Sequence, residues 1–219
     1  MRARGVGWSL AGPGAFALAA FVGGRMEPGY QRRDEPISAL AAKGTRAAKV
    51  MVPGFVGLAV GTVGLARELR GSTGAPSPVP TMLTVAGITT AAAGLARCSD
   101  RSCPTRWLGD LNYTRSDDLH AAFSAATFAL WIATPLVAAS RAHDATPRYR
   151  RWCRRLGLST LVALLIGGML ARRPAQRWGG TAQRLMLASA LAWFPLAAVA
   201  APVPPVAHQA HQGGERRRW

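Results

Sequence analysis

The sequence predicts an all-α protein, a polytopic membrane bundle of six transmembrane helices. Of its 219 residues, 49% are hydrophobic and only 17% are charged, and the charged residues gather in clusters. Long uncharged apolar intervals separate these clusters, and about twenty apolar residues are enough for a helix to cross a bilayer. A chain of this length suits one domain, which we place at residues 1–203, followed by a basic tail at 204–219 that we expect to be disordered.

The first two apolar intervals cover residues 5–24 and 50–66. The first resembles a signal peptide because two arginines precede it, but further spans follow, so we expect it to be retained. In the second, glycines recur every three or four residues and would form a stripe suited to close helix contact in lipid. Chance glycine usage in an alanine-rich sequence would explain the spacing as well. These glycines are Gly54, Gly57, Gly61 and Gly64.

The other four spans are expected at residues 81–96, 119–140, 156–171 and 185–201. The connection 141–155 between the fourth and fifth spans is strongly basic. An even number of spans places both termini on one side, and cytoplasmic termini put this basic cluster in the cytoplasm, as membrane proteins prefer. We therefore expect a cell-membrane protein whose N- and C-termini are cytoplasmic.

The net charge of +17 first suggests a nucleic-acid partner. The arginines, however, lie at the ends of the apolar intervals, where cations meet lipid headgroups. We therefore expect membrane lipids as partners and no nucleic acid.

Four short motifs occur in the first, third and fifth connections. In chain order they are Pro28-Gly29-Tyr30 with Ile37-Ser38-Ala39-Leu40, then Cys98-Ser99-Asp100-Arg101-Ser102-Cys103-Pro104, then His120, then Gly180 with Gln183-Arg184. In this order and spacing the chain resembles the domain-of-unknown-function 998 family of six-span prokaryotic integral membrane proteins. The resemblance implies a fold more than an activity. Ala39 and Ala41 depart from the acidic residue and the glycine that many members carry.

Connections one, three and five of a six-span bundle lie at the same end, so their polar residues are expected to converge on the outer face. The candidate ligand-binding residues are Tyr30, Ser38, Asp117, Asp118, His120 and Arg184. Several lie at helix starts, where backbone N–H groups attract anions, and Arg184 adds a fixed positive charge. The site should therefore prefer an anionic group, such as the phosphate of a lipid headgroup.

Three of these residues are also candidate catalytic groups. Ser38 could act as a nucleophile with His120 as its base and Asp118, or Asp117, as the orienting acid. No nucleophile-elbow pattern surrounds Ser38, and a helix N-cap before residues 39–42 explains this serine more simply. His120 could likewise bond a loop carboxylate or carbonyl, and Arg184 could pair with one of the acids. The sequence therefore assigns no catalytic residue.

The two cysteines of the third connection have two possible roles. Cys98 and Cys103 could bind a metal with Asp100 and His120, but structural zinc sites need a second matching pair that the chain lacks. We expect a Cys98–Cys103 disulfide on the oxidising side of the membrane, a reduced Cys153, and no metal or other cofactor.

Three functions remain open. The favoured one is a non-catalytic membrane module that binds a lipid or a partner protein through a polar site at the outer face. The alternative is a membrane-embedded enzyme that acts on a lipid headgroup or an envelope precursor. A small transporter is the third, and the uncharged spans disfavour it.

Overall fold

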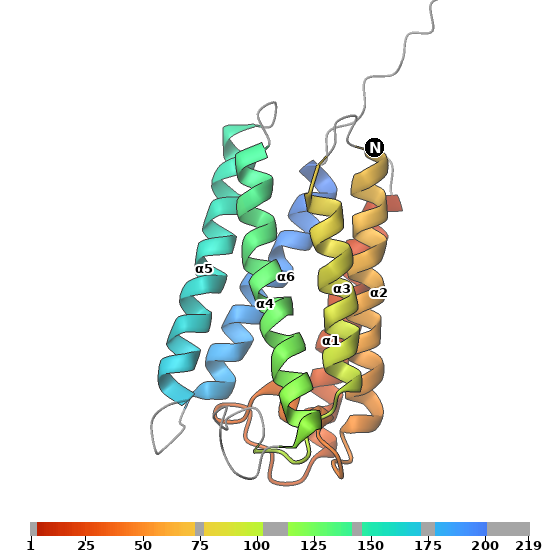
Figure 1. The fold of residues 1–219 in the computed structure, drawn as a ribbon, viewed down its shortest axis with the longest axis vertical. Coiled ribbons are helices and arrows are strands. Elements are labelled where there is room, and N and C mark those ends of the chain that lie inside the picture. Colours follow the sequence, from red (N-terminus) through yellow and green to blue (C-terminus); the bar gives the residue numbers. More distant parts are fainter. Residues whose placement is uncertain (1–3, 73–76, 103–113, 142–145, 172–177, 201–219) are drawn as a thin grey trace, which may run out of the picture.

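The computed structural model describes residues 4–72, 77–102, 114–141, 146–171 and 178–200. These residues form six α-helices and one 3-10 helix, η1, and no strand (Figure 1). In chain order the elements are α1 Arg4–Met26, η1 Ile37–Ala41, α2 Ala48–Ser72, α3 Val79–Leu95, α4 Arg115–Arg141, α5 Pro147–Ala171 and α6 Gly179–Ala200.

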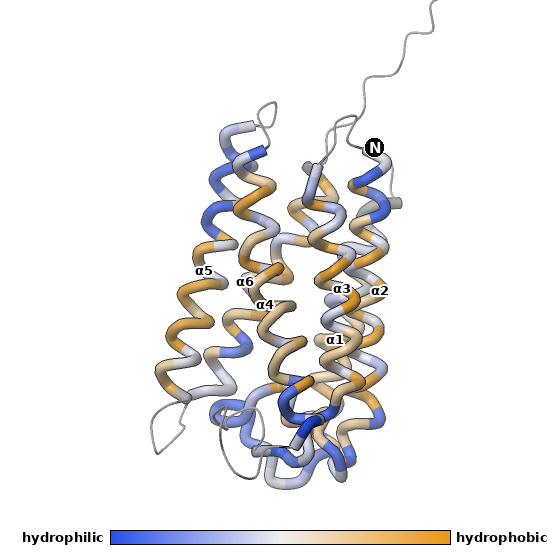
Figure 2. Tube along the Cα trace, viewed as in Figure 1, coloured by the Kyte–Doolittle hydropathy of each residue, from blue (hydrophilic) through white to orange (hydrophobic). Residues whose placement is uncertain are grey.

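Each α-helix packs against the next one in the chain, and α6 also packs against α1, which closes the bundle. The helices run alternately up and down, and their middle parts are apolar whereas the two ends are hydrophilic (Figure 2). Four of them, α2, α4, α5 and α6, are long and apolar enough to cross a membrane, and α3 is a shorter apolar helix. The described residues therefore form a helical bundle of the membrane type.

The glycine stripe of α2 packs against α1, which confirms the interpretation of its spacing as a close helix contact. A Cβ added to Gly61 would lie 2.5 Å from the Cα of Gly12, and one added to Gly54 would lie 2.5 Å from the Cβ of Ala19. A Cβ on Gly64 would come within 2.7 Å of the Trp8 ring. The two backbones can approach this closely only because the stripe has no side chains.

The helices extend beyond the apolar intervals, most of all at α5. The prediction treated residues 141–155 as a connection, but α5 begins at Pro147, so most of the basic cluster is helical. Arginine is a strong helix former, and proline is well suited to the first helical position. Hydropathy marks only the apolar part of a helix, which is why the sequence placed the start of α5 nine residues too late, at 156 rather than 147.

Candidate functional site

The described parts of the first, third and fifth connections meet at one end of the bundle (Figure 1). We call this assembly the cap and define it as residues 27–47, 96–102 and 178–184. The structure brings these three connections together at one end of the bundle, as the sequence predicted. Residues 103–113 and 172–177 lie outside the described residues.

The first connection folds back into the bundle instead of lying across its surface. Every residue of η1 is buried, and Leu40 has no exposed surface. Leu40 belongs to the same core cluster as Trp131 of α4 and Met186 of α6. The run Ile-Ser-Ala-Leu-Ala-Ala is small and apolar enough to fill the space between helix ends, so η1 plugs this end of the bundle.

The start of α6 holds the first connection in place through backbone hydrogen bonds. The N–H groups of Gly180 and Thr181 donate to the carbonyls of Asp34 and Arg33 at 3.1 and 2.9 Å. The Ile37 N–H donates to Oε1 of Gln183 at 2.5 Å. Orphan N–H groups of a helix start and of η1 are thereby satisfied.

Arg184 and Tyr30 form the centre of this contact. The Arg184 guanidinium donates to the carbonyls of Arg32, Glu35 and Gly180, and at 2.6 Å to the Tyr30 hydroxyl. The Tyr30 hydroxyl in turn donates to the Glu35 and Pro36 carbonyls, both at 3.1 Å. Burial raises the pKa of Tyr30 above its usual value, so the phenol stays neutral and keeps its proton for these carbonyls.

The partners of Arg184 correct one expectation. An ion pair with Asp117 or Asp118 was one possibility, but all the described oxygens that Arg184 contacts belong to neutral groups. None of the ion pairs among the described residues involves Arg184. Its positive charge is therefore solvated by dipoles, and no carboxylate of the described residues forms an ion pair with it.

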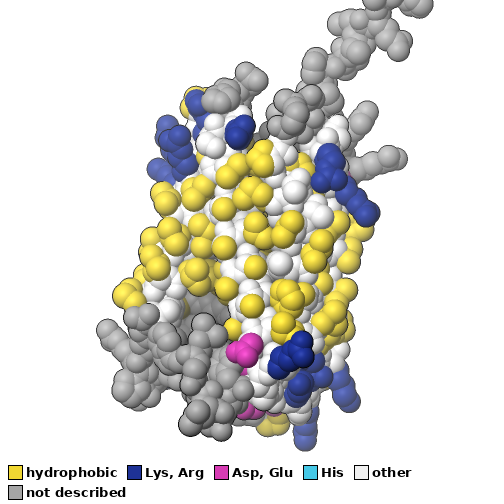
Figure 3. All heavy atoms as spheres, in the orientation of Figure 1, with side chains coloured by type: hydrophobic (Ala, Val, Ile, Leu, Met, Phe, Trp, Pro, Cys, Tyr) yellow, Lys and Arg dark blue, Asp and Glu magenta, His cyan; other side chains and the backbone are white. Residues whose placement is uncertain are grey.

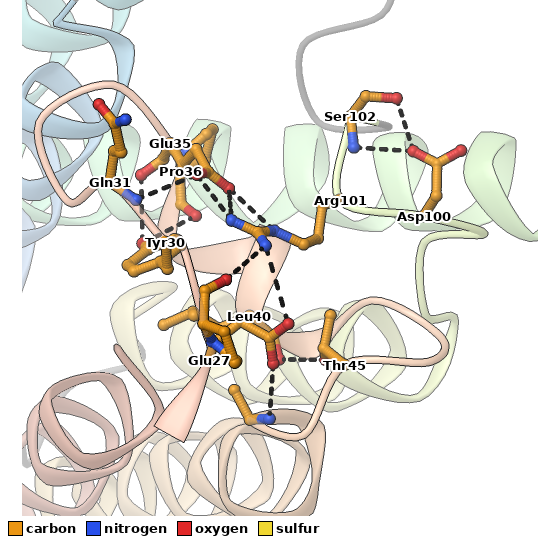
Figure 4. A network of polar contacts seen from close by, with 12 residues as sticks. Glu27, Tyr30, Gln31, Glu35, Pro36, Leu40, Thr45, Asp100, Arg101 and Ser102 are labelled. Carbon is orange, nitrogen blue, oxygen red and sulfur yellow. Dashed lines mark hydrogen bonds and ion pairs between the residues drawn. The ribbon is translucent and has the colours of Figure 1, made fainter. Parts of the chain in front are cut away.

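Arg101 ties the third connection to the first. Figure 4 shows its guanidinium between Glu35, at 2.6 Å, and Glu27, at 3.8 Å. It also donates to the Pro28 carbonyl at 3.1 Å. Glu27 additionally accepts the Arg46 N–H at 2.7 Å, just before α2 begins. Arg101 is thus neutralised by two carboxylates, in contrast to Arg184.

A second arginine of the third connection reinforces this link. Arg97 donates to the carbonyls of Ala41 and Ala42 at 2.9 and 2.8 Å, and the Lys43 N–H donates to the Cys98 carbonyl at 2.8 Å. The carbonyls that η1 leaves open at its end are therefore satisfied from the third connection.

Asp117 fixes the third connection to the start of α4. Its carboxylate accepts the N–H and the hydroxyl of Ser99 at 2.7 and 2.8 Å, and the same two groups of Thr114 at 2.9 and 2.8 Å. The Asp117 side chain is fully buried, whereas the neighbouring Asp118 is exposed. Of the two acids, Asp117 therefore has a structural role.

His120 contacts the end of α3. Its Nδ1 lies 2.8 Å from the Ala93 carbonyl and 3.1 Å from the Ala96 carbonyl, so Nδ1 carries the proton and donates it. Its Nε2 lies 3.5 Å from the Ser124 hydroxyl. Of the two roles considered for His120, a catalytic base or a hydrogen bond to a loop carboxylate or carbonyl, the structure has the second, with backbone carbonyls as the acceptors.

Ser38 lies inside η1 and does not cap it. The N-cap position is Pro36, so the N-cap expected at Ser38 is wrong, because the helical turn begins one residue earlier, at Ile37. Ser38 is 8% exposed, and within the described part of the chain no hydrogen bond joins it to His120.

The described cysteines provide no metal site. Among residues 4–72, 77–102, 114–141, 146–171 and 178–200, no three His, Cys, Asp or Glu side chains are grouped as metal ligands would be. Cys98 is buried and Cys103 lies outside the described residues, so their disulfide stays a prediction. Cys153 is a free thiol, as expected, but it is buried in α5, where it accepts the Trp193 indole N–H at 3.3 Å.

Several residues that build the cap were not singled out in the sequence. They are Glu27, Glu35, Arg97, Ser99, Thr114 and the amide of Gln183 in its role as an acceptor. The signal in the sequence was the concentration of charged residues of both signs in connections one and three.

The comparisons with known proteins agree with this architecture. The model of the family described as "Protein of unknown function (DUF998)" matches residues 10–200. The chain matches neither a curated protein nor a solved structure. Because the matched region includes nearly all of the helical bundle and the whole cap, the chain belongs to the domain-of-unknown-function 998 family.

Proposed function

We propose that this protein is a six-span cell-membrane protein whose cap lies on the outer face and binds the anionic headgroup of a lipid without catalysing a reaction. Both termini are then cytoplasmic. The binding site in this proposal is centred on Arg184, with Tyr30 and the exposed Arg32 beside it.

The observation that carries the proposal is that Arg184 forms no ion pair with any carboxylate of the described residues. A half-buried guanidinium held by carbonyl and hydroxyl oxygens keeps its full positive charge and is fixed in direction. The nearby Arg101 has the same chemistry, but Glu35 and Glu27 neutralise it. Arginine is well suited to phosphate because its planar donors match two phosphate oxygens. An anion is therefore the complementary ligand for Arg184.

The hydrogen bonds of the candidate catalytic residues favour a binding module over the enzyme alternative. A serine nucleophile needs a base within hydrogen-bond reach to take its proton. The protonated nitrogen of His120 points at the α3 carbonyls, and Asp117 is occupied by Ser99 and Thr114. These contacts give each residue a structural role that requires no reaction.

Native mass spectrometry of the full-length protein, purified from membranes that contain both phosphatidylglycerol and phosphatidylcholine, tests the proposal. The wild type should retain phosphatidylglycerol. Arg184→Gln removes the charge while keeping a donor for the carbonyls, and it should lose that lipid by about tenfold or more, as expected for one charge-assisted contact.

The double variant E35Q/R101Q is the matched control. It removes an ion pair of the same cap but leaves the net charge unchanged, so it should retain the lipid. Equal lipid loss in both variants, or no loss in Arg184→Gln, would contradict an Arg184-centred site. A covalently altered lipid that disappears in Ser38→Ala would favour the enzyme instead.

A further inference from the structure

The end of the bundle opposite the cap is strongly and almost uniformly basic. Around the end of α2, the end of α4 and the start of α5, the described basic residues are Arg67, Arg70, Arg141, Arg148, Arg150, Arg151, Arg154 and Arg155. The one described carboxylate at these three helix ends is Glu68. At the cap, by contrast, arginines alternate with carboxylates, and Arg33 and Arg101 form ion pairs with them.

Five of these arginines lie within the first nine residues of α5, and none takes part in an ion pair with a described residue. Four of them, together with Pro147 and Leu158, line a surface hollow of about 400 Å³. Among the residues that the structure describes, no acidic side chain belongs to its lining. Such a concentration of like charge is unfavourable unless an anion compensates it.

The same helix face changes from basic to apolar along its length. Below the arginines, Leu158, Val162 and Leu165 are each more than half exposed. Trp152 is 42% exposed at the level of the arginines, and the Arg155 guanidinium lies 5.5 Å from its ring centroid. Tryptophan and arginine are the residues that mark the boundary between headgroups and hydrocarbon. Figure 3 shows basic side chains gathered at this end, above a continuous apolar belt.

We propose that this face of α5 is a second interaction surface, which binds anionic phospholipids of the adjacent leaflet through Arg150, Arg151, Arg154 and Arg155. The guanidinium groups would contact the phosphates while Leu158 and the residues below it contact the acyl chains. The occupant is a lipid and not a soluble anion because Leu158, which lines the hollow, also belongs to the exposed apolar face with Val162 and Leu165. The surface is independent of Arg184, which lies at the other end of the bundle.

Spin-label measurements on the full-length protein, reconstituted in phosphatidylcholine bilayers, test this surface. The quantity measured is the association constant of spin-labelled phosphatidylglycerol relative to that of spin-labelled phosphatidylcholine. The wild type should prefer phosphatidylglycerol, and added salt should weaken the preference because it screens charges at the membrane surface. The double variant R154Q/R155Q should lower the preference by about thirtyfold, since each arginine near an anionic surface contributes about fivefold.

Two control variants keep the test decisive. The variant R67Q/R70Q removes the same amount of charge at the same end of the bundle but outside the hollow, so it should keep the preference for phosphatidylglycerol. The variant R154K/R155K keeps the positive charge inside the hollow, so it should also keep this preference. An unchanged preference in R154Q/R155Q, or an equal loss in R67Q/R70Q, would overturn the proposal. The proposal would also be overturned if the protein showed no preference for phosphatidylglycerol and instead bound a single-stranded oligonucleotide in a way that depends on Arg154. Arg184→Gln should leave this preference intact, which separates this surface from the cap.

Discussion

Two neighbouring aspartates at the start of α4 lie in opposite environments. Asp117 is buried and accepts four hydrogen bonds from Ser99 and Thr114, and all four donors are N–H or O–H groups. Asp118 is exposed, and no hydrogen bond to a described residue is found for its carboxylate, although its backbone N–H donates to the Thr114 carbonyl at 3.1 Å. The cap therefore depends on a carboxylate at position 117 that only accepts hydrogen bonds, and it does not depend on one at position 118.

Asp117→Asn should destabilise the protein by about 2 kcal/mol, because the amide turns a donor toward groups that are themselves donors. Asp118→Asn is the matched control and should change the free energy of unfolding by less than about 0.5 kcal/mol. Unfolding titrations with sodium dodecyl sulfate in mixed micelles measure both values. Equal effects of the two substitutions would show that the Asp117 contacts do not hold the cap.

At the scale of elements, α1 and α2 form the close helix contact that the glycine stripe predicts. Gly61 faces Gly12, and a Cβ there would lie 2.5 Å from the Gly12 Cα. Gly71, in the last turn of the same helix, has no atom within 4 Å of such a Cβ. Substitutions at these two glycines therefore separate helix packing from helix propensity.

Gly61→Ala should cost about 1–3 kcal/mol, because the backbones must separate to accept the methyl group. Gly71→Ala should be neutral or stabilising by up to about 1 kcal/mol, since alanine is the better helix former. Thermal unfolding in detergent, followed by circular dichroism, compares the two variants with the wild type. A neutral Gly61→Ala would mean that α1 does not pack on this face of α2.

The helices were largely predictable from the sequence, whereas η1 and the contacts of the cap were not. Uncharged intervals indicate the apolar middle of each helix, but a basic start such as that of α5 carries no hydropathy signal. The burial of Leu40 depends on the space left between the helix ends, which only the packed bundle defines. From the sequence, Arg184 could pair with an acid, because acidic side chains are the partners that a sequence makes visible. Its actual acceptors are mostly backbone carbonyls, and these become available only after the first connection has folded.

At the scale of the whole molecule, the two ends of the bundle differ in whether their described arginines form ion pairs. The cap contains ion pairs, a buried plug and, at its centre, Arg184, which forms no ion pair with a described residue. The opposite end carries unpaired arginines around α2, α4 and α5. The proposed orientation, with an outer cap and cytoplasmic termini, places the dense basic cluster at the start of α5 in the cytoplasm, where membrane proteins carry an excess of Lys and Arg.

Cysteine labelling of the two ends tests this arrangement most directly. Gln31 in the cap and Arg148 at the start of α5 are both exposed and lie at opposite ends of the bundle. Each is changed to cysteine and treated with a membrane-impermeant maleimide, with the unsubstituted chain as the background. The account predicts that Gln31→Cys is labelled in intact cells and that Arg148→Cys is labelled only after the membrane is opened. Labelling of both positions from the same side, or the reverse pattern, would contradict it.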